Sequence, residues 1–262
     1  MKKNTLLKSN SLERNFKSLI PLSIKKILIK IIVNKFVGKL IKISRIKLNL
    51  FGGVFDYSTV TANEAASIFF GVWESAEIRF AKRFAKSEII IELGSSVGVT
   101  LGVLSNTLDN RKFICAEASK KNYKKLIHLK KFLPRKGNEY ILLNKAIAYG
   151  VSHVHFKHTS TVGSKITEGN VKSNTSCTVS AITLSEILNQ NAIKGPYTLI
   201  TDIEGAESEI FFKDKIALKN CEIIIAEIEN IQKYTVEKQI SELVKLGFKI
   251  CERYGNVIVM TK

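Results

Sequence analysis

Short runs of apolar residues recur along the chain after residue 70, and stretches with helical periodicity separate them. A continuous apolar run such as 88–93 predicts a strand that is buried on both faces of a parallel sheet. Strands are predicted at 88–93, 112–117, 140–143, 152–157, 197–203, 222–228, 248–252 and 256–261. Helices are predicted at 72–86, 99–107, 120–132, 183–190 and 233–246. This alternation predicts an α/β fold with a mostly parallel sheet, helices on both faces and a C-terminal antiparallel hairpin.

The first 50 residues follow a different pattern, in which apolar and basic residues recur with a helical period. Two pieces, 22–33 and 35–47, each place apolar side chains on one face and basic side chains on the other. The two apolar faces would point in different directions on one continuous helix, so we expect a break near Asn34 or Gly38. The predicted organisation is a basic amphipathic helical extension over 1–60 and an α/β domain over 61–262.

Charge is concentrated in the same extension. The chain carries a net charge of +18, and residues 1–50 hold 13 basic residues against one acid, Glu13. Their apolar runs never exceed three residues, whereas a membrane-spanning helix needs about 20 apolar residues and the core of a signal peptide about 7–15. Residues 20–47 could instead lie on an anionic membrane surface, or pack on the domain with their lysines in water, and the sequence leaves both open.

The four cysteines are far apart and form no C-x-x-C pair, which argues against a disulfide framework and a zinc site. We therefore expect a cytoplasmic protein, peripheral at the inner face of the membrane if the extension binds lipid. His153, His155 and His158 have no suitably spaced third ligand. A divalent metal on the carboxylates Asp202, Glu204, Glu227 and Glu229 is chemically feasible but is not favoured, so no metal site is assigned.

A glycine-containing loop, Glu92-Leu-Gly94-Ser-Ser96-Val-Gly98, joins a buried strand to a helix. Glycines allow the backbone to turn sharply and approach a ligand, and amides at a helix start attract anionic or polar groups. Glu117 ends the next strand, where an acid can bind the two hydroxyls of a ribose. Together these features predict a nucleoside-containing cofactor, the alternative being a structural turn and a solvated glutamate. The spacing differs from the G-x-G-x-x-G of dinucleotide enzymes, and a P-loop motif is absent.

A second acidic motif, Asp202-Ile-Glu204-Gly205-Ala-Glu207, follows the strand predicted at 197–203. Acids at the carboxyl end of a central strand face the ligand crevice of an open α/β sheet, and carboxylates at i and i+2 of an extended chain share a side. The alternative is structural: Asp202 or Glu204 could cap a helix start while Gly205 permits the turn. The pattern favours neither.

A set of spaced motifs resembles the FkbM family of methyltransferases. The motifs are Gly71-Val-Trp-Glu74, Glu92-Leu-Gly-Ser-Ser-Val-Gly98, Ala116-Glu117-Ala-Ser-Lys-Lys-Asn122, Asn144-Lys-Ala146, Thr183-Leu184, Asp202-Ile-Glu-Gly-Ala-Glu207 and Ala226-Glu227-Ile228. They leave residues 1–60 uncovered. The chain departs from the family pattern where Glu92 replaces a usual Asp, Ala118 a usual Pro and Thr201 a usual Lys.

The resemblance implies a class I methyltransferase sheet with S-adenosylmethionine as the methyl donor. It implies that the loop 94–98 binds the donor, Glu117 the ribose and the segment from Asn144 to Ala146 the adenine. The full set of cofactor-binding candidates is Glu74, Glu92, Gly94, Ser96, Gly98, Glu117, Asn144 and Ala146. The resemblance also suggests O-methylation of a hydroxyl on a sugar, glycan or related small molecule.

Transfer to a hydroxyl needs a base, because a hydroxyl is a poor nucleophile until its proton leaves. Asp202 is the first candidate, Glu204 the second, and Glu227 could orient acceptor hydroxyls. Two other functions compete: a membrane-attached S-adenosylmethionine-binding protein without catalysis, and a nucleic-acid methyltransferase. A nucleic-acid partner is not favoured, because the positive charge lies in an apolar-rich segment without interleaved aromatic residues and the chain lacks an N/D-P-P-Y/F tetrapeptide.

Overall fold

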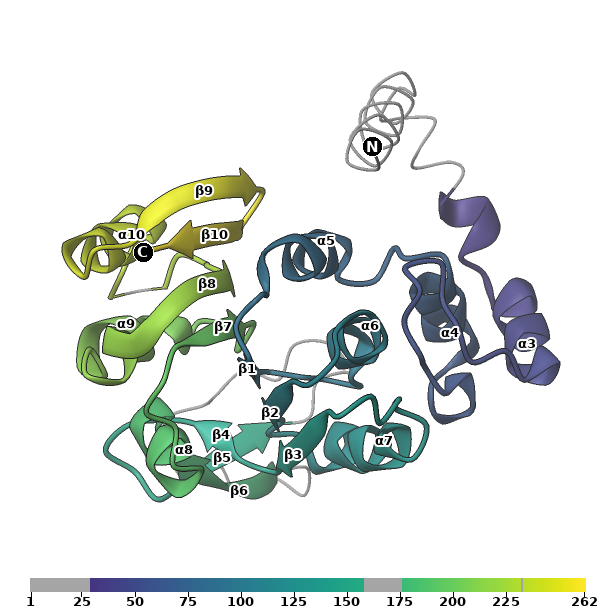
Figure 1. The fold of residues 1–262 in the computed structure, drawn as a ribbon. Coiled ribbons are helices and arrows are strands. Elements are labelled where there is room, and N and C mark those ends of the chain that lie inside the picture. Colours follow the sequence, from purple (N-terminus) through teal and green to yellow (C-terminus); the bar gives the residue numbers. More distant parts are fainter. Residues whose placement is uncertain (1–28, 158–175, 232) are drawn as a thin grey trace. The chain divides into compact units, whose positions relative to one another are not determined.

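The computed structural model describes residues 29–157, 176–231 and 233–262 (Figure 1). These residues form two compact units, each described here by itself. The first comprises the described residues up to Ile46 together with Tyr57–Trp73, and the second comprises Lys47–Asp56 and the described residues from Glu74 to Lys262. The division predicted at residue 60 stays a prediction.

The first unit contains α3 (Lys35–Ser44), a 3-10 turn (Tyr57–Thr59) and α4 (Ala62–Phe69). The expected break lies at Asn34, whose side chain accepts hydrogen bonds from the amides of Phe36 and Val37 and so begins α3. Gly38 serves a different purpose, because a Cβ there would lie 1.7 Å from the carbonyl oxygen of Ala62. The glycine lets α3 and α4 approach closely.

The apolar side chains of α3 do not all find a buried environment. Ile41 is buried, whereas Phe36 is 70% exposed and Ile43 is 76% exposed, and Leu40 is also exposed. Within the part of the chain that the structure describes, every helix is too short or too polar to cross a membrane.

The second unit is built on a seven-stranded sheet in the order β3-β2-β1-β7-β8-β10-β9. The first five strands of that order are parallel to one another, and β10 runs antiparallel to both of its neighbours. The strands are β1 (Ile89–Leu93), β2 (Lys112–Ala116), β3 (Glu139–Leu143), β7 (Tyr197–Thr201), β8 (Cys221–Glu227), β9 (Lys249–Tyr254) and β10 (Val257–Thr261). The predicted fold class, a mostly parallel sheet with a C-terminal antiparallel hairpin, is confirmed.

Helices cover both faces of this sheet, as the sequence pattern predicts (Figure 1). On one face, apolar side chains of α8, α9 and α10 form a continuous core with strand residues such as Ile91, Leu199 and Ile224. The helices α5, α6 and α7 belong to the other face, where α5 contacts β8 and β10. The bounds of the six helices are α5 (Ser75–Phe84), α6 (Val99–Thr107), α7 (Lys120–Lys130), α8 (Leu184–Gln190), α9 (Glu207–Lys213) and α10 (Val236–Lys245).

A second, three-stranded sheet has the order β4-β6-β5, with β4 at Ala146–Ile147, β5 at His153–Lys157 and β6 at Ser176–Ile182. The sequence pattern missed β4 and β6. Two residues are too few to show a period of two, and β6 reads SCTVSAI, in which small polar residues replace the apolar runs of the main sheet.

Candidate active site

Four candidate residues lie in a row across the carboxyl edge of the main sheet. In the strand register Leu93 pairs with both Ala116 and Thr201, and Thr201 pairs with Ala226. The next residue on each strand is Gly94, Glu117, Asp202 or Glu227. The register of four parallel strands thus brings together residues that lie far apart in the sequence, from Gly94 to Glu227.

The glycines of the loop after β1 are required because this loop packs closely against neighbouring segments of the protein. Gly94 has a positive φ of 86°, and a Cβ there would lie 1.9 Å from the carbonyl oxygen of Asp202. Gly98 begins α6 with φ 85°, and a Cβ there would clash with the side chains of Leu126 and Leu129. The sequence analysis explained these glycines by close approach to a ligand. At both positions, packing within the protein also favours glycine.

Glu117 is tied to this loop. Its carboxylate accepts hydrogen bonds from the backbone amides of Ser96, at 2.8 Å, and Ser119, at 2.7 Å. Burial raises the pKa of this carboxyl to about 7, and the two amide bonds oppose that rise. The Asn144 side chain donates to the carbonyl oxygens of Glu117 and Ala118 at 2.9 and 3.1 Å, so it holds the backbone that presents Glu117.

Two other cofactor candidates are more deeply placed. Glu92 is 6% exposed within β1, and the Cys115 thiol donates to its carboxyl at 3.5 Å. Burial raises the pKa of Glu92 to about 8, so this acid holds a proton at neutral pH in the absence of a ligand. Ala146 is buried in β4.

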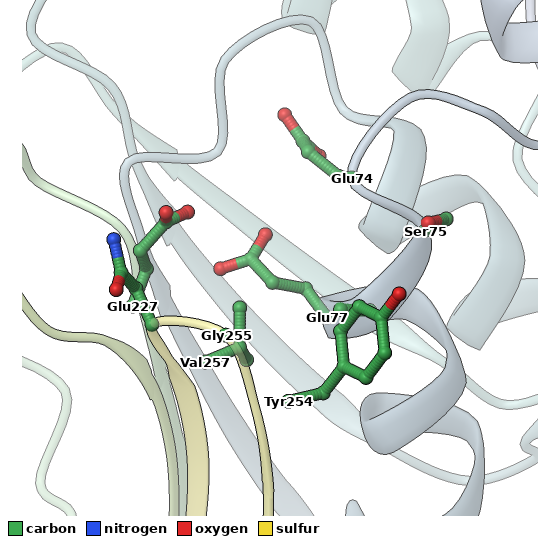
Figure 2. Close-up of a pocket in the computed structure, with 9 residues that line it drawn as sticks. Glu74, Ser75, Glu77, Glu227, Tyr254, Gly255 and Val257 are labelled. Carbon is green, nitrogen blue, oxygen red and sulfur yellow. The ribbon is translucent and has the colours of Figure 1, made fainter. Parts of the chain in front are cut away.

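Three carboxyl groups from three different elements converge next to the row of strand ends. One oxygen from each of Glu77 in α5, Asp202 after β7 and Glu227 at the end of β8 lies within 4.8 Å of the others. Glu77 is only 5% exposed, and its Oε1 has no hydrogen-bond partner among the described residues. Figure 2 shows the carboxyl groups of Glu77 and Glu227 directed toward the same space. We call these three residues the acid cluster.

The environment of the acid cluster disfavours three negative charges. Burial, followed by the charge of Glu227, raises the pKa of Asp202 to about 7. Burial also raises the pKa of Glu77 well above its ordinary value, with further contributions from Glu74 and Asp202. The pKa of Glu227 is raised by burial first and then by the charges of Glu229 and Glu204. At neutral pH these groups must share protons or receive a positive charge from elsewhere.

Sequence reasoning missed Glu77, although a signal was present. The residue lies three positions before Phe80 and four before Ala81, both of which are buried on α5. It therefore occupies the apolar face of its helix, where an acid without a partner is expensive to bury. An acidic residue at a core position of an amphipathic helix is an unusual pattern, and it could have identified Glu77 from the sequence.

The acidic residues of the motif after β7 have different roles in the structure. Glu207 accepts hydrogen bonds from the amides of Ile203 at 2.5 Å and Gly205 at 2.8 Å, so this glutamate holds the turn. Asp202 instead belongs to the acid cluster. The prediction that Asp202 and Glu204 share a side of an extended strand is wrong, because β7 ends at Thr201 and Glu204 is exposed with a left-handed φ of 56°.

A pocket of about 360 Å³ opens beside the acid cluster. Its walls come from the start of α5, the end of β8 and the turn between β9 and β10 (Figure 2). Glu74, Glu77 and Glu227 provide its acidic side, and Tyr254 provides an aromatic ring. The candidate Glu74 is thus a pocket residue next to the acid cluster.

The histidines lie elsewhere. His153 and His155 are exposed on β5, and His158 lies outside the described residues. His128 pairs with Asp56 at 2.6 Å. In the described part of the chain, the acid cluster is the group of three that could hold a metal ion, and it contains no histidine.

Comparison with known families gives one match. The family described as the methyltransferase FkbM domain matches residues 106–255, more than half of the chain. The matched range contains the strand ends that carry Glu117, Asp202 and Glu227, and it excludes the loop 94–98 and Glu77. A search of curated proteins gives no match.

Several solved methyltransferases are similar in fold. Magnesium protoporphyrin IX methyltransferase of Synechocystis, solved with bound S-adenosylmethionine, is 10% identical over 77% of this chain and 83% of that chain, with a TM-score of 0.43. Precorrin-6y C5,15-methyltransferase of Geobacter metallireducens is 12% identical over 83% and 98%, with a TM-score of 0.44. Fibrillarin of Aeropyrum pernix, with natively bound S-adenosylmethionine, is 10% identical over 72% and 74%, with a TM-score of 0.42. These likenesses concern the fold and do not identify an acceptor.

Proposed function

Because the chain belongs to the FkbM methyltransferase family, we propose that it transfers a methyl group from S-adenosylmethionine to a hydroxyl oxygen of a sugar, glycan or related small molecule. The observation that carries this proposal is the row of Gly94, Glu117, Asp202 and Glu227 at the carboxyl edge of the sheet. In open α/β sheets, ligands bind in the crevice outside this edge.

The donor would lie across the strand ends of β1 and β2. The Glu117 carboxylate stands at the end of β2, where it can accept hydrogen bonds from ribose hydroxyls while the amides of Ser96 and Ser119 hold it in place. Asn144 fixes the backbone beneath it. S-adenosylmethionine supplies an activated methyl group on sulfur.

Asp202 is the proposed general base. It follows the central strand β7, its cluster partners Glu227 and Glu77 line the pocket of about 360 Å³, and the neighbouring turn is held by Glu207 instead. In this proposal the acceptor oxygen forms its bond to the methyl carbon as the sulfur–carbon bond breaks, and the hydroxyl proton passes to the Asp202 carboxylate. Glu227 and Glu74 would orient acceptor hydroxyls in the pocket.

Transfer of a labelled methyl group tests this function. The purified full-length chain is incubated with methyl-labelled donor and separate glycan, lipid and RNA fractions of a cell extract, and the labelled product is identified. Label in a hydroxyl-bearing glycan or small molecule supports the proposal. Label in RNA would replace the acceptor class, and donor binding without transfer to any fraction would favour the alternative of a binding protein without catalysis.

We also propose that the basic extension attaches the protein to an anionic membrane surface on the cytoplasmic side. The exposed side chains of Phe36, Leu40 and Ile43 lie on a helix that also carries Lys35, Lys39 and Lys42. A helix that lies in a membrane interface inserts its apolar side chains among the lipids, and its basic side chains contact anionic headgroups. The α3 helix has both kinds of side chain.

A further inference from the structure

The acid cluster contains a carboxyl group that the proposed catalysis does not use. Glu77 is 5% exposed, its Oε1 is buried without a hydrogen-bond partner among the described residues, and its side chain points into the space that the Glu227 carboxyl also faces (Figure 2). A buried polar group without a partner costs free energy, and a buried charge without a counter-charge costs more. The cluster therefore lacks a positive component.

Among the residues that the structure describes, no positive side chain lines the adjoining pocket. Its walls consist of residues from Glu74 to Glu77, Glu227 and the segment Tyr254–Val257, none of which is Lys, Arg or His. The guanidinium of Arg79 packs on the Tyr254 ring of this wall, 5.2 Å from its centroid, but Arg79 is not a lining residue. Within the lining, the negative charge can be balanced by protons or by a bound cation. Three carboxyl oxygens held by three separate elements are suited to a hard cation, because such ions select carboxylate oxygen ligands.

We propose that Glu77, Asp202 and Glu227 bind one hard divalent cation of the Mg²⁺ or Ca²⁺ class. Two oxygens on opposite sides of Mg²⁺ lie about 4.2 Å apart, and on Ca²⁺ about 4.6–5.2 Å apart, given the usual metal–oxygen distances. The three carboxyl oxygens lie within 4.8 Å of one another. This limit falls within the range for Ca²⁺, and Mg²⁺ would require the three oxygens to lie closer together.

The placement gives such a cation a role in the reaction, an inference that rests on the proposed function. Glu77 and Glu227 also line the pocket, so coordination positions that the protein leaves open can be filled by water or by acceptor oxygens. A coordinated hydroxyl loses its proton more readily. One oxygen of Asp202 can then coordinate the ion while the other accepts the proton. The acceptor would be a molecule that presents oxygen ligands.

The site is tested with metals alone. The full-length chain, stripped with a chelator, is titrated calorimetrically with MgCl₂, CaCl₂ and MnCl₂, and bound Mn²⁺ is counted by electron paramagnetic resonance. One cation per chain is expected. Glu77→Gln and Glu227→Gln should each weaken binding at least tenfold, whereas Glu222→Gln, the same change at an exposed position of β8, should leave it unchanged.

Melting temperature provides a second readout. The cation should raise the melting temperature of the unmodified chain and not that of Glu77→Gln. Without cation, Glu77→Gln should melt higher than the unmodified chain, because the substitution removes one of three carboxyl groups that repel one another in a buried site. A folded chain that binds none of the three cations, or binding that persists in Glu77→Gln, would overturn the proposed site. The negative charge of the acid cluster would then be balanced by shared protons.

Donor binding on the same samples separates the two proposals. A chain that binds S-adenosylmethionine but no cation retains the proposed function without the metal site. A chain that binds the cation but no S-adenosylmethionine retains the site without the function.

Discussion

Asp202 and Glu207 are five positions apart in one acidic motif, and the structure gives them different tasks. Glu207 holds the backbone amides of the turn, and Asp202 joins the acid cluster. The sequence allowed Asp202 or Glu204 to cap a helix start and either of these two to act as base. Which acid turns inward depends on the left-handed backbone at Glu204, and a sequence pattern does not specify that.

Replacement of Asp202 by Asn should separate catalysis from architecture. The amide keeps the shape but cannot serve as the base, so turnover should fall roughly 10²–10⁴-fold. Donor affinity should change little and melting temperature should not fall, because Glu207 holds the turn. Turnover is measured by methyl transfer, and stability by thermal melting of the same preparation.

Two further variants, Glu207→Gln and Glu204→Gln, make this result interpretable. Glu207→Gln should lower the free energy of unfolding by roughly 1–2 kcal/mol, and with it the melting temperature, because it weakens the hydrogen bonds to two turn amides. Near-normal turnover in Asp202→Asn together with a large loss in Glu204→Gln would move the role of base to Glu204.

The buried Glu92 should make stability depend on pH. Its folded-state pKa is raised to about 8 by burial, so the folded chain retains a proton that the unfolded chain loses near pH 4.5. The favourable contribution of this proton is complete below the unfolded pKa and is lost as pH rises toward 8. Glu92→Gln should reduce the fall in unfolding free energy between pH 5 and pH 8 by an amount on the order of a few kcal/mol.

Urea unfolding at a series of pH values measures this slope. Glu222→Gln, exposed on β8, serves as the matched control and should leave the slope unchanged. A slope that is the same in Glu92→Gln and in the unmodified chain would show that Glu92 is ionised in the folded protein.

Among the elements, the strands of the main sheet were predictable and several short elements were not. The strands β1, β7 and β8 each contain a run of apolar residues, such as Ile89–Ile91 and Ile223–Ala226, because both faces of these strands are covered. By contrast, α4 and α9 have eight and seven residues, in which a helical period is hard to detect, and they were missed, although α8, also of seven residues, was predicted at 183–190. The position of Glu77 depended on how α5 packs near β8, which a pattern of single elements does not contain.

The exposed side of α3 gives the membrane proposal a measurable form. The chain should sediment with anionic vesicles at low salt and be released as salt rises, since each cation near the surface contributes about 1 kcal/mol. Phe36→Ser combined with Ile43→Ser should reduce the bound fraction without lowering the melting temperature, because both side chains are exposed.

Ile216→Ser is the matched control for that experiment. Ile216 is 85% exposed in the second unit, so its replacement removes about as much exposed apolar surface as Ile43→Ser alone, without touching α3. Equal vesicle binding by the Phe36→Ser and Ile43→Ser double variant and by this control would show that α3 is not the membrane contact.

At the scale of the whole molecule, sheet topology converts distant sequence motifs into one site. The parallel order β2-β1-β7-β8 aligns Glu117, Gly94, Asp202 and Glu227 at one edge. This juxtaposition was predictable, because carboxyl ends of parallel strands meet on the same side. The acceptor was not predictable, because the pocket proposed for it combines α5 with the β9–β10 turn, and neither carries a motif for a substrate.

Calorimetric titration of the full-length chain with S-adenosylmethionine tests the central claim most directly. The account predicts one binding site per chain, with affinity reduced in Glu117→Gln roughly 10–100-fold, as the loss of a charge-assisted hydrogen bond to ribose requires. Glu222→Gln should bind as the unmodified chain does. Absence of binding by the folded, unmodified chain, or tighter binding of NAD than of S-adenosylmethionine, would contradict the account.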